Sequence, residues 1–296
     1  MGSRMEELRA EAPSIEVSVL IVSYNSIAPL RRCLTALEQS TQRETFEVLV
    51  VDNGSSDGCE TIDSEFTGVT MLRLPRHFGL TKARNIGIRT AKGEHLLLMT
   101  PEVEVHPGTV AALAARLPQE SSALAVAPLM VDGGSKVVSE LRHLPTPEVV
   151  SKCWRSGVPA EEVAGDVQEA VPVELHDGSA LLIRKRAIQG INYLDERFGE
   201  SWGDCDLAFQ IRKAGRKILL LGDVRATVRE KAVPFGGVLF EADRAVGAVG
   251  YAGKNFGFMA GLGLRLKIAL GALLSGELGL MSRVVEGRKI DGTDVF

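Results

Sequence analysis

Alternation of buried strands and helices through the first hundred residues limits the fold more than any other feature of this sequence. Continuous runs of β-branched and aliphatic residues, such as VSVLIVS at 17–23, are typical of strands that are buried on both faces. Such strands are expected at residues 17–23, 47–51, 69–74 and 95–99. Helices are expected between them, at residues 29–38, 59–66 and 81–91. This order predicts an α/β fold with a mostly parallel sheet flanked by helices.

The periodic signal is weaker in the second half of the chain. A helix at 108–117 and a strand at 123–130 are expected, and then a long, mobile insertion over 132–172, where Gly, Pro and mixed charges break any period. Further elements are expected as a strand at 179–184, a short helix at 186–190, a helix at 204–214 and a strand at 217–221. From about Glu241 onward the tail is expected to be helical.

Three loops leave the carboxyl ends of the expected strands, beginning at Tyr24, Asp52 and Thr100. Ligands of open α/β sheets bind at these ends, so the three loops predict a single crevice. Asp52 opens the turn-rich segment DNGSSDG, and its carboxylate is able to accept hydrogen bonds from a nucleotide base or ribose. A helix-capping role for this acidic cluster is the alternative. Neither a Gly-x-Gly-x-x-Gly fingerprint nor a Gly-Lys-Ser/Thr phosphate loop follows the first strand.

Charge and hydropathy argue against several other classes of protein. The formal net charge is −4 with acids and bases interspersed, which disfavours a nucleic-acid backbone as partner. Residues 1–5 resemble a tag remnant, residues 1–14 are expected to be disordered, and no signal-peptide core follows them. Charged residues interrupt the apolar stretch at 256–281, so no membrane span is expected. The four cysteines are scattered and suggest neither a disulfide framework nor a zinc site, which favours a cytoplasmic protein.

Three segments of the first half resemble the opening of family-2 glycosyltransferases of the GT-A fold, especially the bacterial rhamnosyltransferase-like branch. They are Val17–Asn25, Val50–Gly58 and Gly79–Gly87, in the order and spacing of that family. The resemblance covers residues 16–105 and 174–226. It implies a GT-A catalytic domain over 15–230, with a donor half at 15–106, an acceptor half at 174–230, and a helical C-terminal extension over 231–296.

The resemblance also implies which residues meet the nucleotide-sugar donor. Tyr24 and Asp52 stand at positions that contact the nucleotide base in the family, and the helix that carries Arg84 and Asn85 lines the donor pocket. His77 stands where the family often has Asn, and it is expected to be a surface histidine rather than a ligand.

The family's metal motif, commonly Asp-x-Asp or Asn-Pro-Asp, corresponds here to MTPEVE at 99–104. Glu102 aligns with the key Asp and keeps a carboxylate, whereas Thr100 replaces the other acid. Glu104 lies two residues on, where strand alternation points it the same way as Glu102. Mg²⁺ or Mn²⁺ prefers oxygen ligands and bridges the donor diphosphate, so Glu102 is the first expected ligand and Glu104 the second. Two solvated glutamates in a loop, with a weakly held or dispensable metal, are the alternative.

The segment FGESWGDCDL at 198–207 resembles the family's Glu-Asp-x-Asp-Leu motif, which opens a helix and supplies the catalytic base. Asp204 matches the base, and Gly203 stands where Glu is usual. An inverting transfer needs one carboxylate at the acceptor hydroxyl, and a helix N-terminus favours its ionised form. Asp206 is the rival on the acceptor side, and a simple N-terminal helix charge is its alternative.

Further acceptor-side residues are implied around this motif. Gly178 and Ser179 match the family's acceptor loop, where small residues admit a sugar. Trp202 is expected either to stack on the acceptor ring or to fill the core.

These implications together predict an inverting glycosyltransferase with a glycan or polyprenyl-linked acceptor, in bacterial cell-surface polysaccharide synthesis. The basic, apolar tail either rests on anionic lipid at the inner face of the membrane or packs on the core or on a second subunit. A catalytically degenerate scaffold is the alternative from another class, because Thr100, Gly203 and His77 all depart from the family pattern. A sugar nucleotidyltransferase is disfavoured, since residues 23–26 offer no Gly-rich basic loop.

Overall fold

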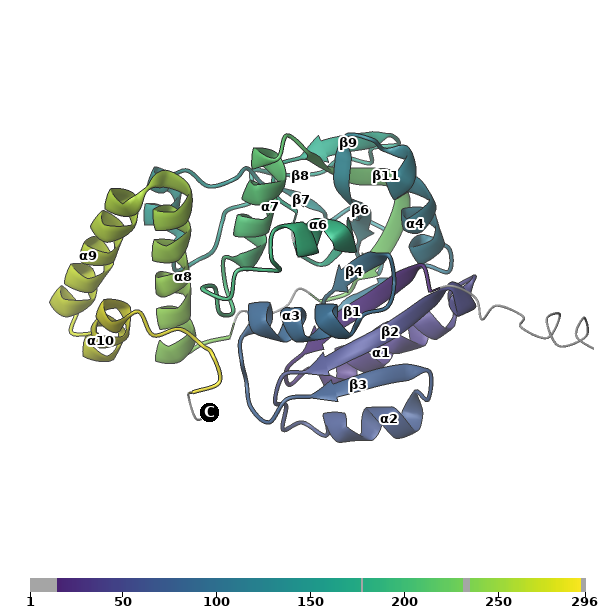
Figure 1. Ribbon diagram of the computed structural model, residues 1–296, viewed down its shortest axis with the longest axis horizontal. Helices are drawn as coiled ribbons and strands as arrows, with labels where there is room; N and C mark the ends of the chain where they lie inside the picture. Colours follow the sequence, from purple (N-terminus) through teal and green to yellow (C-terminus); the bar gives the residue numbers. More distant parts are fainter. Residues whose placement is uncertain (1–14, 177, 231–234, 294–296) are drawn as a thin grey trace, which may run out of the picture.

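The computed structural model describes residues 15–176, 178–230 and 235–293, so the expectation for residues 1–14 lies outside the described residues. Within these ranges a nine-stranded sheet crosses the molecule, and helices cover it on both sides (Figure 1). Its strands follow the order β3 (Val69–Arg73), β2 (Phe46–Asp52), β1 (Val17–Ser23), β4 (His95–Met99), β10 (Ala180–Arg184), β6 (Ala123–Val131), β11 (Lys217–Val228) and β5 (Val103–Val105), with β9 (Ala170–Val173) beside β11.

The strands of the first half pair in parallel and end at the same edge of the sheet. Ser23 pairs with Asp52, and Ile21 pairs with Met99. The loops that follow β1, β2 and β4 therefore leave the sheet side by side. The predicted α/β fold is confirmed in this half, strand by strand.

The second half adds antiparallel pairs to the same sheet. β10 lies antiparallel between β4 and β6, whereas β11 is parallel to β6 and antiparallel to β5 and β9. β11 continues past the expected end at residue 221 to Val228, with a register shift between Leu221 and Arg225. β5 has only three residues, which is too short for a periodic signal.

Alternate residues of the buried strands face two separate cores. Along β1, Leu20 belongs to one buried cluster, whereas Val19 and Ile21 belong to the other. α3 (Leu80–Thr90) and α7 (Gly203–Lys213) cover the first cluster, and α1 (Ile27–Glu38) and α4 (Thr109–Gln119) cover the second. Because both faces are buried, the strands appear in the sequence as continuous apolar runs. Shorter helical segments complete the connections, at Cys59–Thr61, α2 (Ile62–Glu65) and α6 (Lys185–Gly190).

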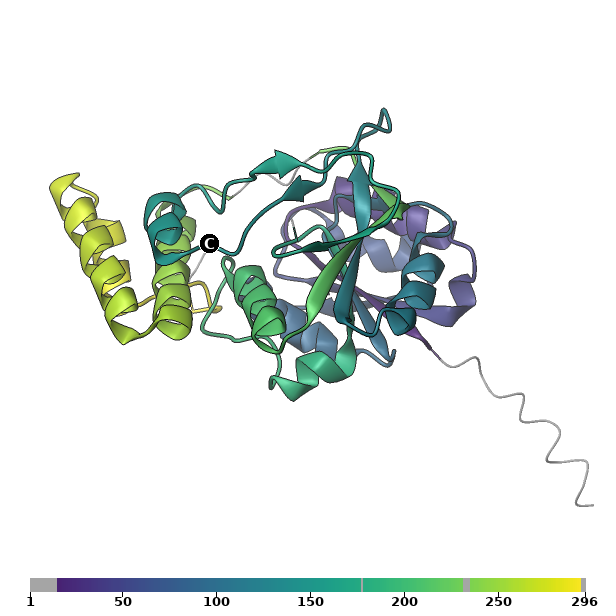
Figure 2. The same ribbon diagram turned by 90° about the horizontal axis from the view of Figure 1, so that it is seen from above.

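The stretch 132–172, expected as a long, mobile insertion, contains short regular elements. This stretch forms β7 (Glu140–Leu141), α5 (Pro147–Cys153), β8 (Glu162–Val163) and β9. β7 and β8 pair with each other, and α5 packs against the C-terminal helices (Figure 2). These elements are two to seven residues long, so each is too short to show a period.

The tail forms a layer of helices at one end of the molecule, α8 (Val238–Phe256), α9 (Phe258–Leu274) and α10 (Leu278–Glu286) (Figures 1 and 2). α8 and α9 approach closely at two glycines, since a Cβ at Gly261 would lie 2.8 Å from the Cα of Gly253. Along the described residues, every helix is too short or too polar to cross a bilayer.

The segment after α10 returns to the first half of the chain, and we call residues 289–293 the return segment. Arg76 Nη1 donates to the carbonyl oxygen of Gly292 (2.8 Å), and Lys82 Nζ donates to that of Asp291 (3.4 Å). The Phe78 ring covers Gly292, where a Cβ would lie 2.2 Å from it. The tail is therefore fastened to the loop that leads into α3.

Candidate active site

The loop after β2 is held in place by its own side chains. The Asp52 carboxylate accepts a hydrogen bond from Ser55 N (2.9 Å), and Asn25 Oδ1 accepts one from Ser56 N (2.8 Å). Asp57 Oδ2 accepts from Ile27 N (2.7 Å) at the start of α1. Asp57 therefore takes the capping role considered for this acidic cluster, and Asp52 lies at the carboxyl edge of the sheet.

Tyr24 lies against a buried histidine. Its ring centroid is 4.1 Å from that of His77, which is 1% exposed, so the expectation of a surface histidine is wrong. Burial lowers the pKa of His77 to about 4, which keeps the ring neutral at pH 7. Its Nδ1 accepts from Gly79 N (3.1 Å) and lies 3.0 Å from Asn53 Nδ2, so the proton is assigned to Nε2. That atom faces Glu200 Oε2 at 3.5 Å.

Two further acids, the half-buried Glu200 and the fully buried Asp243, lie beside this loop without a motif that marks them in the sequence. Glu200 Oε2 accepts from Leu80 N (2.9 Å) in the first turn of α3, and burial, with the charge of Asp243 nearby, raises the pKa of Glu200 to about 8. Asp243 of α8 accepts from the backbone N–H groups of Glu200 (2.9 Å), Ser201 (3.0 Å) and Ile290 (3.0 Å). Burial raises the pKa of Asp243 to about 6 despite these bonds. Asp243 thus ties the segment before α7 to the return segment.

Asp204 stands at the start of α7 and forms an ion pair with Arg84 of α3. Arg84 Nη1 donates to Asp204 Oδ1, and its side chain is 5% exposed whereas that of Asp204 is 40% exposed. The second carboxylate oxygen, Oδ2, lies next to Gly178, where a Cβ would be 3.1 Å away. Ser179, the next residue, accepts from Thr100 N (2.9 Å) after β4. The structure therefore connects the expected base, the acceptor loop and the end of β4.

The two glutamates of the expected metal motif have different surroundings. Glu104 Oε1 accepts from Arg229 Nε (2.8 Å) and pairs with Arg32 Nε at 3.3 Å, so its charge is compensated by arginines. Glu102 Oε2 is buried and has no hydrogen-bond partner in the described part of the chain. Both carboxylates help to raise the pKa of the Cys33 thiol on α1, after the larger effect of burial. Both carboxylates therefore lie within electrostatic range of α1, with Glu102 in the turn before β5 and Glu104 inside it.

Glu102 fits a cation that is shared with a substrate. Among the described residues no group of three or more His, Cys, Asp or Glu side chains is placed to enclose a metal ion. Mg²⁺ is often bound by one or two carboxylates together with substrate phosphates, and the unpartnered oxygen of Glu102 is a suitable ligand of that kind.

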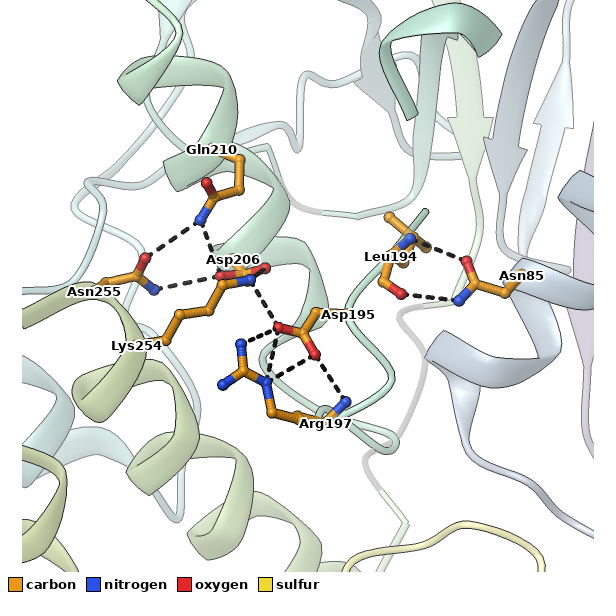
Figure 3. A network of polar contacts seen from close by, with 8 residues as sticks. All are labelled: Asn85, Leu194, Asp195, Arg197, Asp206, Gln210, Lys254 and Asn255. Atoms are coloured by element: carbon orange, nitrogen blue, oxygen red, sulfur yellow. Dashed lines mark hydrogen bonds and ion pairs between the residues drawn. The ribbon is translucent and has the colours of Figure 1, made fainter. Parts of the chain in front are cut away.

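Asn85 and Asp206 belong to a polar network on another side of α7 (Figure 3). Asn85 Nδ2 and Oδ1 bond to the backbone of Leu194 at 2.9 and 3.0 Å. Asp206 is 4% exposed and accepts from Lys254 Nζ (2.7 Å), which also donates to Asp195 (2.8 Å). These residues line a cavity of about 690 Å³ that Asp204 does not line.

A second cavity, of about 200 Å³, adjoins Asp204 on the side of the insertion and the tail. Its wall includes Trp154, Trp202, Arg142 and Arg244. Trp202 is 7% exposed, has a left-handed backbone (φ 72°) and packs on Tyr251 with ring centroids 5.6 Å apart. Trp202 therefore fills the core for the most part, whereas the half-buried Trp154 offers more of its indole.

Two glycosyltransferases are among the solved structures that resemble this fold. The mannosyltransferase PcManGT of Pyrobaculum calidifontis, in complex with GDP-Man and Mn²⁺, matches 94% of the chain at a TM-score of 0.56 and 16% identity, over 76% of its own length. GalNAc-T7 with UDP, GalNAc and Mn²⁺ matches 81% of the chain at a TM-score of 0.58 and 19% identity, and the chain spans only 51% of it. At these identities the likeness shows the fold, which is GT-A.

Sequence comparison assigns the family. The glycosyl transferase family 2 model matches residues 18–185, which is more than half of the chain, so the chain belongs to glycosyl transferase family 2. A relative in Mycobacterium tuberculosis, N-acetylglucosaminyl-diphospho-decaprenol L-rhamnosyltransferase, is 27% identical over 220 residues, which are 67% of this chain and 70% of the relative. The resemblance to the rhamnosyltransferase-like branch is thereby confirmed.

Proposed function

We propose that the chain is an inverting glycosyltransferase in which Asp204 is the general base. The ion pair between Arg84 and Asp204 carries this proposal. The buried guanidinium fixes the position of the carboxylate, while the carboxylate itself stays open to a cavity. Because Oδ1 is bonded to Arg84, Oδ2 is the oxygen that receives the proton.

The proposed step transfers one sugar. The acceptor hydroxyl gives its proton to Asp204 Oδ2, and its oxygen forms a bond to the anomeric carbon. The bond between that carbon and the phosphate oxygen of the donor breaks, and its electron pair leaves with the nucleoside diphosphate. A general base of this kind contributes on the order of 10²–10⁴ in rate.

The donor is proposed to lie at the carboxyl edge of β1, β2 and β4. Tyr24 and Asp52 would contact the nucleotide base, and Glu102 would hold Mg²⁺ or Mn²⁺. A bound cation would neutralise charge on the departing diphosphate. Arg84 positions the base, and Asn85, through its bonds to Leu194, positions the loop beside α7.

The acceptor is proposed to be a glycan or a polyprenyl-linked sugar, as in cell-surface polysaccharide synthesis. The name of the mycobacterial relative, with its diphospho-decaprenol acceptor, supports the second class. The outer side of α9 supports a membrane-bound position: Phe258, Met259 and Leu274 are 75%, 73% and 80% exposed, and the helix contains no acid. An apolar helix face beside basic residues such as Lys267 is suited to an anionic lipid surface.

Vesicle flotation tests this lipid contact. The chain is expected to float with vesicles of about 70% phosphatidylcholine and about 30% phosphatidylglycerol, and Leu270→Glu is expected to remain in the dense fraction. Val163→Glu, at another exposed apolar position, is the control. A dimer in solution that Leu270→Glu dissociates would instead assign the α9 face to a second copy.

Substitution of the proposed base tests the function. Asp204→Asn is expected to lower turnover about 10²–10⁴-fold and to leave nucleotide binding intact. A thermal-shift panel of nucleoside diphosphates, with and without Mn²⁺, first identifies the nucleotide. Asp206→Asn separates the two candidate bases, because Asp206 is paired with Lys254 and its loss is expected to lower stability rather than turnover of the folded enzyme. Full activity of Asp204→Asn would end the assignment, and binding without nucleotide release from any donor would favour the degenerate scaffold.

A further inference from the structure

Two arginines line the cavity beside Asp204, and they come from the insertion and the tail, where the sequence shows little regular periodicity. Arg142 follows β7, and its carbonyl oxygen accepts from Leu175 N (3.2 Å). Arg244 lies on α8. Both side chains line the same cavity of about 200 Å³ as Asp204.

Each guanidinium is fixed by a protein acceptor and keeps a buried donor for another partner. Arg142 Nη2 donates to Glu140 Oε2 (2.5 Å), and Arg244 Nη1 donates to the carbonyl oxygen of Phe235 (3.0 Å). In the described chain the Nε atom of each is buried and has no hydrogen-bond partner. A buried charged donor without an acceptor is unfavourable, so each guanidinium keeps hydrogen-bonding capacity that its protein partners do not use.

The position of the pair relative to Asp204 indicates which substrate it serves. Arg84 reaches Asp204 from α3 of the donor half, whereas Arg142 and Arg244 reach the cavity from the insertion and the tail. In an in-line transfer the base lies with the acceptor, and the leaving diphosphate lies across the anomeric carbon. An anion site that adjoins the base therefore belongs to the acceptor side.

We propose that Arg142 and Arg244 bind a phosphate group of the acceptor. This inference rests on the proposed function and deepens it, because it specifies a phosphorylated acceptor. A planar guanidinium matches the oxygens of a phosphate. Arg244 is the stronger contributor, since Glu140 already balances the charge of Arg142, whereas Arg244 bonds to a neutral carbonyl group.

Inorganic phosphate is the probe. The protein is first saturated with the nucleoside diphosphate that the thermal-shift panel selects, so that the donor side is filled. Phosphate is then titrated and followed by ³¹P line broadening or calorimetry. Arg244→Gln is expected to weaken phosphate binding about 10- to 100-fold, and Arg142→Gln less, because each removes charge-assisted hydrogen bonds.

Arg155→Gln is the matched control. Arg155 is next to Trp154 in sequence, but it pairs with Glu277 at 2.7 Å and does not line the cavity. It is expected to leave phosphate binding unchanged. Arg244→Lys, which keeps the charge but has no Nε donor, is expected to fold and still to weaken binding several-fold.

Three results would overturn the inference. They are no phosphate binding to the nucleotide-loaded protein, equal phosphate binding by wild type and Arg244→Gln, and a loss of nucleotide affinity in Arg244→Gln, which would assign the arginines to the donor. A different result would contradict the proposed function itself: wild-type protein that binds none of the nucleoside diphosphates in the thermal-shift panel.

Discussion

Replacement of Asp243 tests how far the C-terminal helices belong to the catalytic framework. Asp243 is fully buried on α8, and its carboxylate accepts from the backbone N–H groups of Glu200, Ser201 and Ile290 at 2.9–3.0 Å. Gly199 packs so closely that a Cβ there would lie 1.9 Å from Asp243 Oδ1. The carboxylate thus sets the path of the chain just before the proposed base.

The expected loss of stability follows from these bonds. Asp243→Ala leaves three backbone N–H groups without acceptors, at about 1–3 kcal/mol for each group that is buried. The N–H groups of Glu200 and Ser201 are only partly buried, and the substitution also removes a buried carboxylate, so we expect a net cost of about 3–6 kcal/mol. Asp243→Asn keeps one acceptor oxygen but replaces the other with an NH2 group, which faces a backbone N–H group. We expect this substitution to lower the free energy of unfolding by about 1–3 kcal/mol. At roughly 2–4 °C per kcal/mol, the melting temperature is expected to fall by about 6–24 °C for the alanine variant.

Thermal unfolding and turnover are measured together. Below its melting temperature Asp243→Asn is expected to bind nucleotide normally and to turn over at least about 10-fold more slowly, because the segment that leads to the base is less fixed. Glu241→Ala is the control on the same helix, since Glu241 makes a surface pair with Arg155 at 3.7 Å that contributes about 0–1 kcal/mol. A melting temperature for Asp243→Ala equal to that of Glu241→Ala would refute the reasoning.

Three further predictions concern the site itself. Gly178→Ala is expected to reduce turnover at least about 10-fold without changing nucleotide affinity, because its φ is +84° and its Cβ would lie 3.1 Å from Asp204 Oδ2; steady-state kinetics with wild-type turnover would contradict this. The carboxyl group of Glu200 has a folded-state pKa of about 8 against 4.5 as its ordinary value, so the unfolded chain ionises first and stability falls as the pH rises between these values. Each pH unit in that window costs up to about 1.4 kcal/mol, and Glu200→Gln is expected to flatten the curve in melting experiments across pH 5–8. Glu102→Gln is expected to abolish any Mn²⁺-dependent thermal shift of the nucleotide complex, whereas Glu104→Gln, which breaks ion pairs with arginines, is expected to keep it; the reverse pattern would exchange their roles.

The strands and helices of the donor half could be predicted from the sequence, because each of them shows its own apolar pattern. β1 and β2 each consist mainly of apolar residues, and the helices between the strands have their own apolar faces. The end of each strand then follows from the run itself. Asp204 could be placed at the start of a helix by its motif for the same reason.

The wall of the cavity beside Asp204 could not be predicted, because segments that are distant in the sequence form it together. Arg142 and Trp154 directly follow β7 and α5, which are too short to show a period, and Arg244 lines the cavity from a helix that the sequence presents only as an apolar tail. His77 was expected at the surface, since nothing in its neighbourhood along the chain shows that Tyr24 and Asn53 cover it. Packing across the fold decides these positions.

The return segment connects α3 and the loop before it to the backbone that precedes the proposed base. It contacts Arg76 and Lys82 ahead of the nucleotide side, and through Ile290 it shares Asp243 with the backbone that precedes Asp204. A ligand that shifts one attachment changes the free energy of the other, and such coupling is reciprocal. We therefore expect nucleotide to alter affinity for the acceptor by the same factor by which the acceptor alters affinity for nucleotide.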